Sequence, residues 1–182
     1  MPDPVNGRVT GGPPRRLLLR LVLVLAAFLA VGAVAGVVWE RLWSPPTGLV
    51  VDNAWYLDAD GVQEDFSGTG LYVLVALATG ALLGLATALT TRGHELATLA
   101  VVAAGSVAAA WLMLLTGTAL GPPDPRPLAD GREDYTEIPS DLRVVGLAPY
   151  VVMPAGALTT VAVCFIGLNG SRRSGSDREP DR

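Results

Sequence analysis

The sequence contains no lysine, one cysteine and one histidine, and only 16% of its 182 residues are charged. The single cysteine, Cys164, excludes a disulfide within the chain and any site built from several thiolates. The formal charge of -4 argues against a nucleic-acid partner, because binding phosphate requires a basic surface. All thirteen basic side chains are arginines, a bias typical of GC-rich bacterial genomes.

Residues that could carry chemistry are equally scarce. The sequence has no glycine-rich phosphate loop and no G-x-S-x-G elbow. His94 precedes Glu95 but lacks the second histidine of a zinc-protease motif. With Gly61 in the glycine position of an EF-hand loop, Tyr56 and Ser67 fall where carboxylate ligands are required. We therefore predict no catalytic residue, no cofactor and no metal site, and no small-molecule ligand can be inferred.

Apolar sequence is abundant: 51% of the residues are hydrophobic. Four runs can cross a hydrocarbon core of ~30 Å, which takes about 20 helical residues; they cover 17–39, 71–90, 96–120 and 148–168. The sequence therefore predicts an all-α membrane protein, a four-helix transmembrane bundle over residues 17–168. Disordered tails are expected at 1–16 and 169–182. Deeper than Arg20, the spans hold no Asp, Glu, Lys, Arg or His, which argues against proton-coupled transport by this chain alone.

Helix boundaries are also marked in the sequence. Ser67-Gly68-Thr69-Gly70 is predicted to precede the second span, and Asn169-Gly170 to end the fourth. Pro149 suits a first helical turn, whereas Pro154 falls inside the fourth span, where a lost hydrogen bond should bend the helix.

The distribution of arginines predicts the orientation. They dominate both tails and the short connection near Arg92, whereas the two long outer loops, 40–70 and 121–147, are acidic. The positive-inside rule therefore places both termini in the cytoplasm. The predicted location is a bacterial plasma membrane, with the lipid bilayer as the surrounding partner.

The outer loops have the composition of a small β structure. The first loop is rich in β-branched and aromatic residues and contains Asp60-Gly61, a tight-turn dipeptide. We expect a hairpin with strands near 49–57 and 62–66, and a further strand within 132–138. Together these strands would form a small extracytoplasmic β-hairpin cap.

Two tryptophans close the first span. Trp39 and Trp43 are predicted to anchor it at the membrane interface, where an indole buries its ring and leaves its N–H among headgroups. Pro45 and Pro46 then prevent the helix from continuing. A cleaved signal peptide is the alternative, because Ala33-Val34-Ala35 resembles a cleavage site.

Small residues recur at helical spacing. Gly32 and Gly36 form one small-xxx-small pair and Gly80 and Gly84 form another, so each helix can admit a neighbouring backbone. These pairs could serve the bundle itself or a homo-oligomer, and the sequence leaves both possibilities open.

The stretch from Ala35 to Val50 carries a family resemblance. Ala35-Gly36, Trp39, Leu42, Pro45, Gly48 and Val50, with Ala148-Pro149 later, resemble an uncharacterised family of actinobacterial membrane proteins, domain of unknown function 2567. The resemblance covers about 31–168 and implies four spans, a β-rich first outer loop and a fourth span that begins with Ala-Pro. The acidic outer face departs from that pattern. The family implies no activity or ligand.

Three hypotheses about function follow. The first is a non-enzymatic scaffold or accessory subunit that binds another envelope component through the outer cap and assembles through the small-residue helix faces. The second is a small transport or channel subunit, conducting as an oligomer through a pore lined by Thr79, Thr87, Ser106, Thr159 and Thr160. The third, an enzyme, requires polar residues of both outer loops to meet, for example Asp52, Asp58, Glu133 and Tyr135.

Overall fold

The structure is a computed structural model that describes residues 15–57, 59–90, 95–144 and 146–176. Long helices dominate it, and short strands follow the first helix and precede the last. In chain order the elements are α1 (Arg15–Leu42), β1 (Thr47–Val51), β2 (Ala54–Tyr56), α2 (Ala59–Thr90), α3 (Glu95–Leu120), β3 (Glu137–Pro139) and α4 (Ala148–Ser176).

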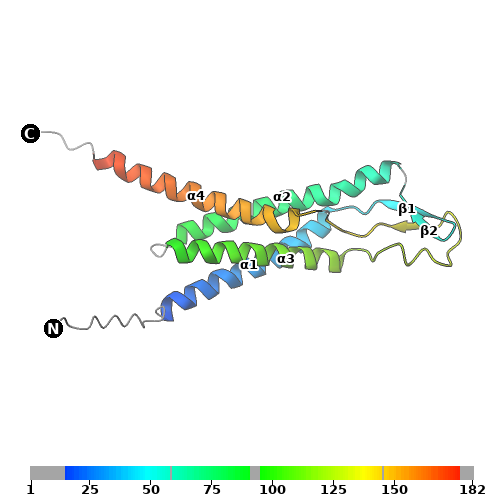
Figure 1. Ribbon diagram of the computed structural model, residues 1–182, viewed down its shortest axis with the longest axis horizontal. Coiled ribbons are helices and arrows are strands. Elements are labelled where there is room, and N and C mark those ends of the chain that lie inside the picture. Colours follow the sequence, from blue (N-terminus) through cyan, green and yellow to red (C-terminus); the bar gives the residue numbers. More distant parts are fainter. Residues whose placement is uncertain (1–14, 58, 91–94, 145, 177–182) are drawn as a thin grey trace, which may run out of the picture.

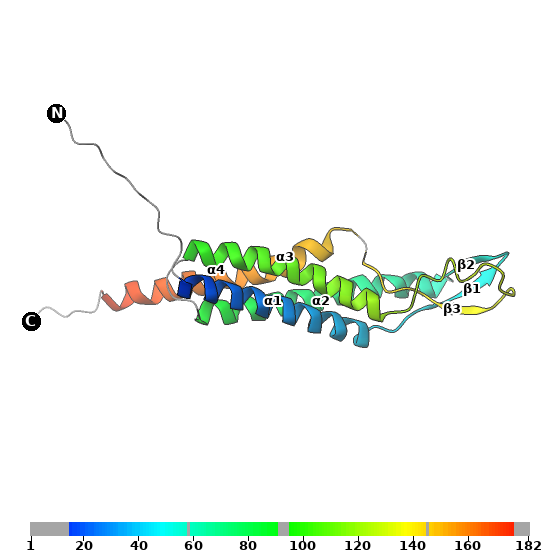
Figure 2. The ribbon, with the colours of Figure 1, turned by 90° about the horizontal axis from the view of Figure 1, so that it is seen from below.

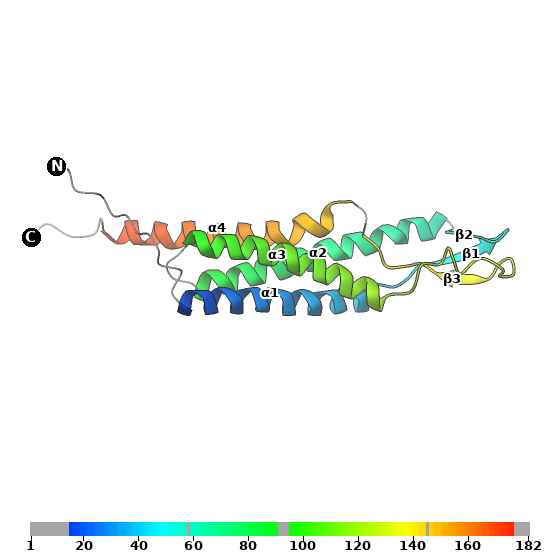
Figure 3. The same ribbon diagram turned by 60° about the horizontal axis from the view of Figure 1, so that its bottom comes forward.

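The four helices form an elongated bundle with the strands beyond one end of it (Figure 1). Each helix contains a segment long and apolar enough to cross a membrane, at Leu18–Leu42, Ser67–Thr90, Leu96–Leu120 and Ala148–Ile166. The predicted spans are therefore confirmed as helices of membrane-spanning length and composition. The beginning of α1 and the end of α4 lie at the end of the molecule opposite the strands (Figure 3).

The helices pack as two parallel pairs, α1 with α3 and α2 with α4, and these pairs join mainly through α3 and α4. Gly32 faces Ala109 and Gly36 faces Met113, so residue numbers rise together along α1 and α3. The other pair repeats this arrangement, with Gly80 against Met153 and Gly84 against Ala157. Helices adjacent in sequence are therefore not the closest neighbours.

Strand β1 is the centre of a three-stranded antiparallel sheet of order β2-β1-β3. Leu49 pairs with Tyr56 on one side and with Glu137 on the other. The sheet thus joins the two outer segments, and β3 overlaps the end of the predicted stretch 132–138, whose first five residues form no strand. Figure 2 shows the sheet and its connections as one projection at the end of the bundle.

The first hairpin differs from the prediction in its turn and its second strand. The turn is formed by Asp52 and Asn53, whose φ angles are 51° and 60°. A two-residue turn with both φ angles positive matches the twist of paired strands, and Asn and Asp tolerate that conformation. Asp60-Gly61 and the predicted strand 62–66 lie instead within α2.

Two predicted helix boundaries are also wrong. Ser67-Gly68-Thr69-Gly70 lies inside α2, which extends beyond the span toward the sheet (Figure 1). Asn169-Gly170 lies inside α4, so residues 169–176 are helical rather than a disordered tail, as are residues 15 and 16. Residues 1–14 and 177–182, also predicted to be disordered, lie outside the described residues, as do Arg92 and His94.

Candidate functional site

A chain of contacts joins all four helices near the strand-bearing end of the bundle. Its first member is Trp39 of α1, whose side chain is fully buried. The indole Nε1 donates a hydrogen bond to the Gly68 carbonyl of α2 at 2.9 Å. The indole ring also lies against Gly117 of α3, where a Cβ would overlap it.

Tyr72 of α2 extends this chain. Its ring meets Trp39 edge to face, with ring centroids 5.1 Å apart. Its hydroxyl lies 3.1 Å from the carbonyl oxygens of Ala110 in α3 and Pro149 in α4, and it donates to this pair. Tyr72 is fully buried, so these two acceptors replace the water that its hydroxyl has lost. The contacts fix the relative positions of the helices and leave no group of the cluster exposed for catalysis.

Trp43 lies one turn beyond Trp39 and is also buried, with 8% of its surface exposed. Its Nε1 has no hydrogen-bond partner in the part of the chain that the structure describes. It approaches Gly68, where an added Cβ would lie 3.2 Å away. Gly68 is therefore the small residue at which the indoles of Trp39 and Trp43 both reach α2.

This burial corrects the prediction for the two tryptophans. A membrane-interface anchor exposes its ring to lipid and its N–H to headgroups, whereas Trp39 and Trp43 face the bundle interior. Trp111 of α3 is the tryptophan with an exposed ring, at 54%. A large aromatic residue at the end of a span is compatible with both the membrane interface and the bundle interior. The packing partner that decides between the two lies far away in the sequence.

The glycine pairs lie at the closest approaches within the bundle. A Cβ at Gly32 would lie 2.5 Å from the Ala109 carbonyl oxygen, and one at Gly36 would lie 2.5 Å from that of Met113. Cβ atoms at Gly80 and Gly84 would overlap the backbones of Met153 and Ala157. Both pairs therefore pack inside one chain, and their faces are not available to a second copy.

The hydroxyls of the channel hypothesis are engaged along their own helices. Thr87 donates to the Leu83 carbonyl at 2.8 Å, and Thr160 donates to that of Gly156 at 2.9 Å. Ser106 donates to the Ala103 carbonyl at 3.0 Å and is fully buried. Thr159 faces outward on α4, and Thr79 is half-buried. These positions give no support to a line of hydroxyls along one axis.

The outer segments form a single cap, made of β1, β2, β3 and the chain from Gly121 to Asp141. One sheet face, with Val50, Ile138 and part of Trp55, packs on Ala129. The Trp55 indole Nε1 donates to the Ile138 carbonyl at 3.0 Å. This hydrogen bond links the two edge strands, β2 and β3, across β1. This small apolar core gives the hairpin the third strand and the cover that a hairpin alone lacks.

Hydrogen bonds at the distant tip of the cap also connect the two outer segments. The Tyr135 amide donates to the Val50 carbonyl at 2.7 Å. The Asp52 amide donates to an Asp134 carboxylate oxygen at 3.0 Å, and the Gly131 amide donates to the Asn53 side-chain oxygen at 3.2 Å. The segments are some 80 residues apart in sequence, as the separation of 82 between Asp52 and Asp134 shows.

The other face of the cap sheet is open. Residues directly opposite one another in a sheet share a face, so Tyr56, Leu49 and Glu137 form a row across it. Tyr56 is 58% exposed and Leu49 is 38% exposed. The cap also carries exposed carboxylates, at Asp52, Asp130, Glu133, Asp134 and Glu137. We refer to the row and these carboxylates as the cap face.

The residues named for an enzymatic site do not form a pocket. Asp52, Glu133 and Tyr135 are all exposed at the surface of the cap, and Asp58 lies outside the described residues. Among the described residues, no group of three His, Cys, Asp or Glu side chains could hold a metal ion. Cys164 is free, half-buried and packed at the edge of the main core.

Comparison of the chain with models of protein families, with curated proteins and with solved structures gives no match in any of the three.

Sequence reasoning missed Tyr72 and Gly68. The available signal was a tyrosine one turn after a Gly-x-Gly, at the start of an apolar run. A buried hydroxyl in such a run requires a carbonyl partner, but the sequence does not indicate which helix supplies it. The cap face was missed in part, because the hairpin was assigned the wrong turn.

Proposed function

We propose that this chain is a non-enzymatic scaffold or accessory subunit of a bacterial plasma membrane, which binds another envelope component through its cap face. The observation that supports the proposal is the cap, in which strand pairing and hydrogen bonds join the two outer segments. Two acidic segments, distant in sequence, fold into one sheet that holds an exposed tyrosine and leucine side by side. A surface that combines exposed aromatic, aliphatic and charged residues on one folded unit has the composition of an interface.

The bundle supports a role as a membrane platform. Large apolar side chains are exposed along the helices, for example Leu74 at 66%, Leu82 at 67% and Val163 at 63%. A contiguous surface of this kind is unfavourable in water and suits lipid. The arginines near the bundle end opposite the cap favour cytoplasmic termini, which would hold the cap outside the membrane.

The closed interior argues against a pore through a single chain. Trp39 and Tyr72 fill the bundle near the cap, and the glycine pairs bring the helix backbones into contact farther along. The hydroxyl groups that a pore would require donate to carbonyls of their own helices at Thr87, Ser106 and Thr160. No observation in the structure favours the channel hypothesis, so we do not propose it.

The chemistry of the cap face indicates the kind of partner. Its carboxylates outnumber the two cap arginines, Arg126 and Arg132, so the cap is acidic. Electrostatic complementarity then favours an envelope protein with a basic surface and an apolar centre that fits Tyr56 and Leu49. The resemblance to the four-span family of domain of unknown function 2567 stays a prediction beside this proposal.

Purification of the tagged protein from its native membrane tests the proposal. Wild type, Tyr56→Ser and Tyr150→Ser are compared, because Tyr150 is also exposed, at 46%, but lies on α4 outside the cap. Loss of an aromatic residue at the centre of an interface weakens binding by roughly tenfold or more. We expect an envelope protein to be recovered with wild type and Tyr150→Ser and to be depleted with Tyr56→Ser. Equal recovery with all three would contradict a role of the cap face.

A further inference from the structure

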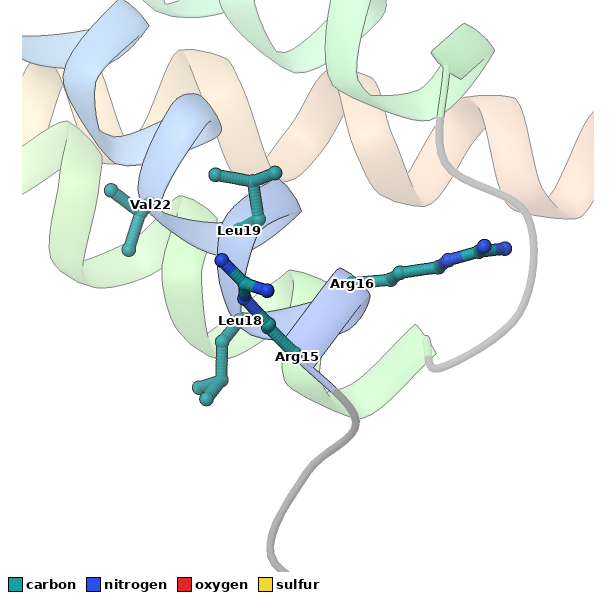
Figure 4. Close-up of a pocket in the computed structure, with 5 residues that line it drawn as sticks. All are labelled: Arg15, Arg16, Leu18, Leu19 and Val22. Carbon is teal, nitrogen blue, oxygen red and sulfur yellow. The ribbon is translucent and has the colours of Figure 1, made fainter.

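The first turns of α1 border a hollow in the molecular surface, at the bundle end opposite the cap. Its volume is about 580 Å³, and its lining residues are Arg15, Arg16, Leu18, Leu19 and Val22 (Figure 4). The lining therefore combines two guanidinium groups with three aliphatic side chains on successive turns of one helix.

The two arginines supply a positive charge that is not neutralised locally. Both are exposed, and within the described part of the chain neither has a carboxylate at ion-pair distance; Arg41 and Glu40 form the described ion pair, at the far end of α1. In Figure 4, Arg15 turns back along the helix toward the aliphatic side chains, whereas Arg16 extends away from them. The hollow therefore offers an anion at least one guanidinium beside an apolar surface.

The aliphatic part of the lining lies where the candidate span begins. Leu18 is the first residue of that span, and Leu18, Leu19 and Val22 are 48%, 60% and 59% exposed. A ligand that satisfies the whole lining needs an anionic group at the level of the arginines and an alkyl chain that continues into the span. Free phosphate would satisfy the first requirement only, and a neutral lipid the second only.

We propose that this hollow binds an anionic phospholipid, with the phosphate at Arg15 and an acyl chain along Leu18, Leu19 and Val22. Basic pockets beside membrane helices recognise lipid headgroups in this way. The proposal requires that the chain lies in a bilayer, but it is independent of what the cap face binds.

Native mass spectrometry of the full chain in mild detergent tests the proposal. The protein is offered phosphatidylglycerol and phosphatidylcholine in equal amounts and with identical acyl chains, so that only the headgroup differs. Each arginine near a lipid surface contributes about a fivefold preference for an anionic lipid. We therefore expect a preference for bound phosphatidylglycerol of about fivefold, because Arg15 lies beside the aliphatic side chains (Figure 4). Equal binding of the two lipids would overturn the proposal.

Two matched variants separate the hollow from general surface charge. Arg15→Gln and Arg20→Gln each remove one exposed positive charge from the same end of α1, but Arg20 does not line the hollow. The preference should fall about fivefold in Arg15→Gln and by a smaller factor in Arg20→Gln. Equal losses would overturn the proposal, because charge alone would then explain the binding.

Inorganic phosphate distinguishes a lipid from a free anion. Millimolar phosphate, added to the complex of wild type with phosphatidylglycerol, should leave the lipid bound, because the aliphatic lining contributes to its retention. Complete displacement of the lipid would show that the arginines bind phosphate alone and would overturn the lipid assignment.

Discussion

Trp39 and Tyr72 meet edge to face in the bundle interior, with ring centroids 5.1 Å apart and ring planes at 82°. Edge-to-face pairs of this kind contribute about 0.5 to 1.5 kcal/mol beyond the area that they bury. Through their polar atoms the same two residues reach Gly68, Ala110 and Pro149. The pair therefore fixes the helix ends from which the cap projects, and the cap face depends on it for its position.

The Tyr72 hydroxyl should contribute measurably to the stability of the bundle. Tyr72→Phe removes the hydrogen bond shared by the Ala110 and Pro149 carbonyls and keeps the ring against Trp39. Hydrogen bonds between membrane helices are worth about 0.6 kcal/mol on average and up to about 1.7. We expect a loss in this range when unfolding is measured in detergent micelles. Tyr150→Phe, at an exposed tyrosine, is the control, and equal effects of the two variants would refute the role of Tyr72.

The effect on stability of replacing a glycine in α2 by alanine should depend on the atoms that surround that glycine. A Cβ at Gly84 overlaps the Ala157 backbone, whereas a Cβ at Gly70 has nothing within 4 Å. Gly84→Ala should therefore destabilise the protein by roughly 1 to 3 kcal/mol through overpacking. Gly70→Ala should be neutral or stabilising by up to about 1 kcal/mol, because alanine favours the helix. Thermal unfolding of both variants in the same detergent makes the comparison, and destabilisation of Gly70→Ala alone would be inconsistent with the observed helix pairing.

The burial of Trp39 and Trp43 predicts which indole lipid chains can reach. In bilayers whose acyl chains carry bromine, tryptophan fluorescence is quenched only where bromine can approach the ring. Trp111 is 54% exposed on α3, while Trp39 and Trp43 are buried. Most of the quenching should therefore disappear in Trp111→Phe. Because Trp111 is exposed, this substitution should have little effect on the fold. Quenching that persists in full would mean that Trp39 or Trp43 faces lipid.

The proposed orientation places Tyr56 and Leu96 on opposite sides of the membrane. Both are exposed, at 58% and 84%, and they lie on the cap and at the opposite end of the bundle. In a Cys164→Ser background, a membrane-impermeant maleimide should label Tyr56→Cys in intact cells. It should label Leu96→Cys only after permeabilisation. The reverse pattern would place the cap in the cytoplasm and remove the basis for an envelope partner.

The spans were predictable because each requires only about 20 consecutive apolar residues, a property local in sequence. The glycine spacing indicated that helices approach closely, but it did not indicate that Gly80 would face Met153 rather than a second chain. Trp39 was misassigned for the same reason: its partners, Gly68 and Tyr72, are about thirty residues away, as the separation of 29 between Trp39 and Gly68 shows. Non-local packing decided each of these positions.

The hairpin shows a different limit. Asp-Gly is a stronger turn signal than Asp-Asn, so the sequence favours a turn at Asp60-Gly61, whereas the turn forms at Asp52-Asn53. Pairing with the segment around β3 fixes where the first strand ends. The Val50 amide donates to the Thr136 carbonyl, and the Tyr135 amide donates to the Val50 carbonyl. The cap face follows from this register. From the sequence, the cap could therefore be predicted only as a small acidic β structure.

The most direct test of the central claim, that the cap face recognises an envelope partner, is site-specific photo-crosslinking in the native membrane. A photoreactive residue is placed at Tyr56 on the cap face or at Leu82, which is 67% exposed on the outer side of α2. If the cap face binds a partner, a discrete crosslinked envelope protein is expected from position 56 and not from position 82. No crosslinked protein from position 56, or the same protein from both positions, would contradict that claim.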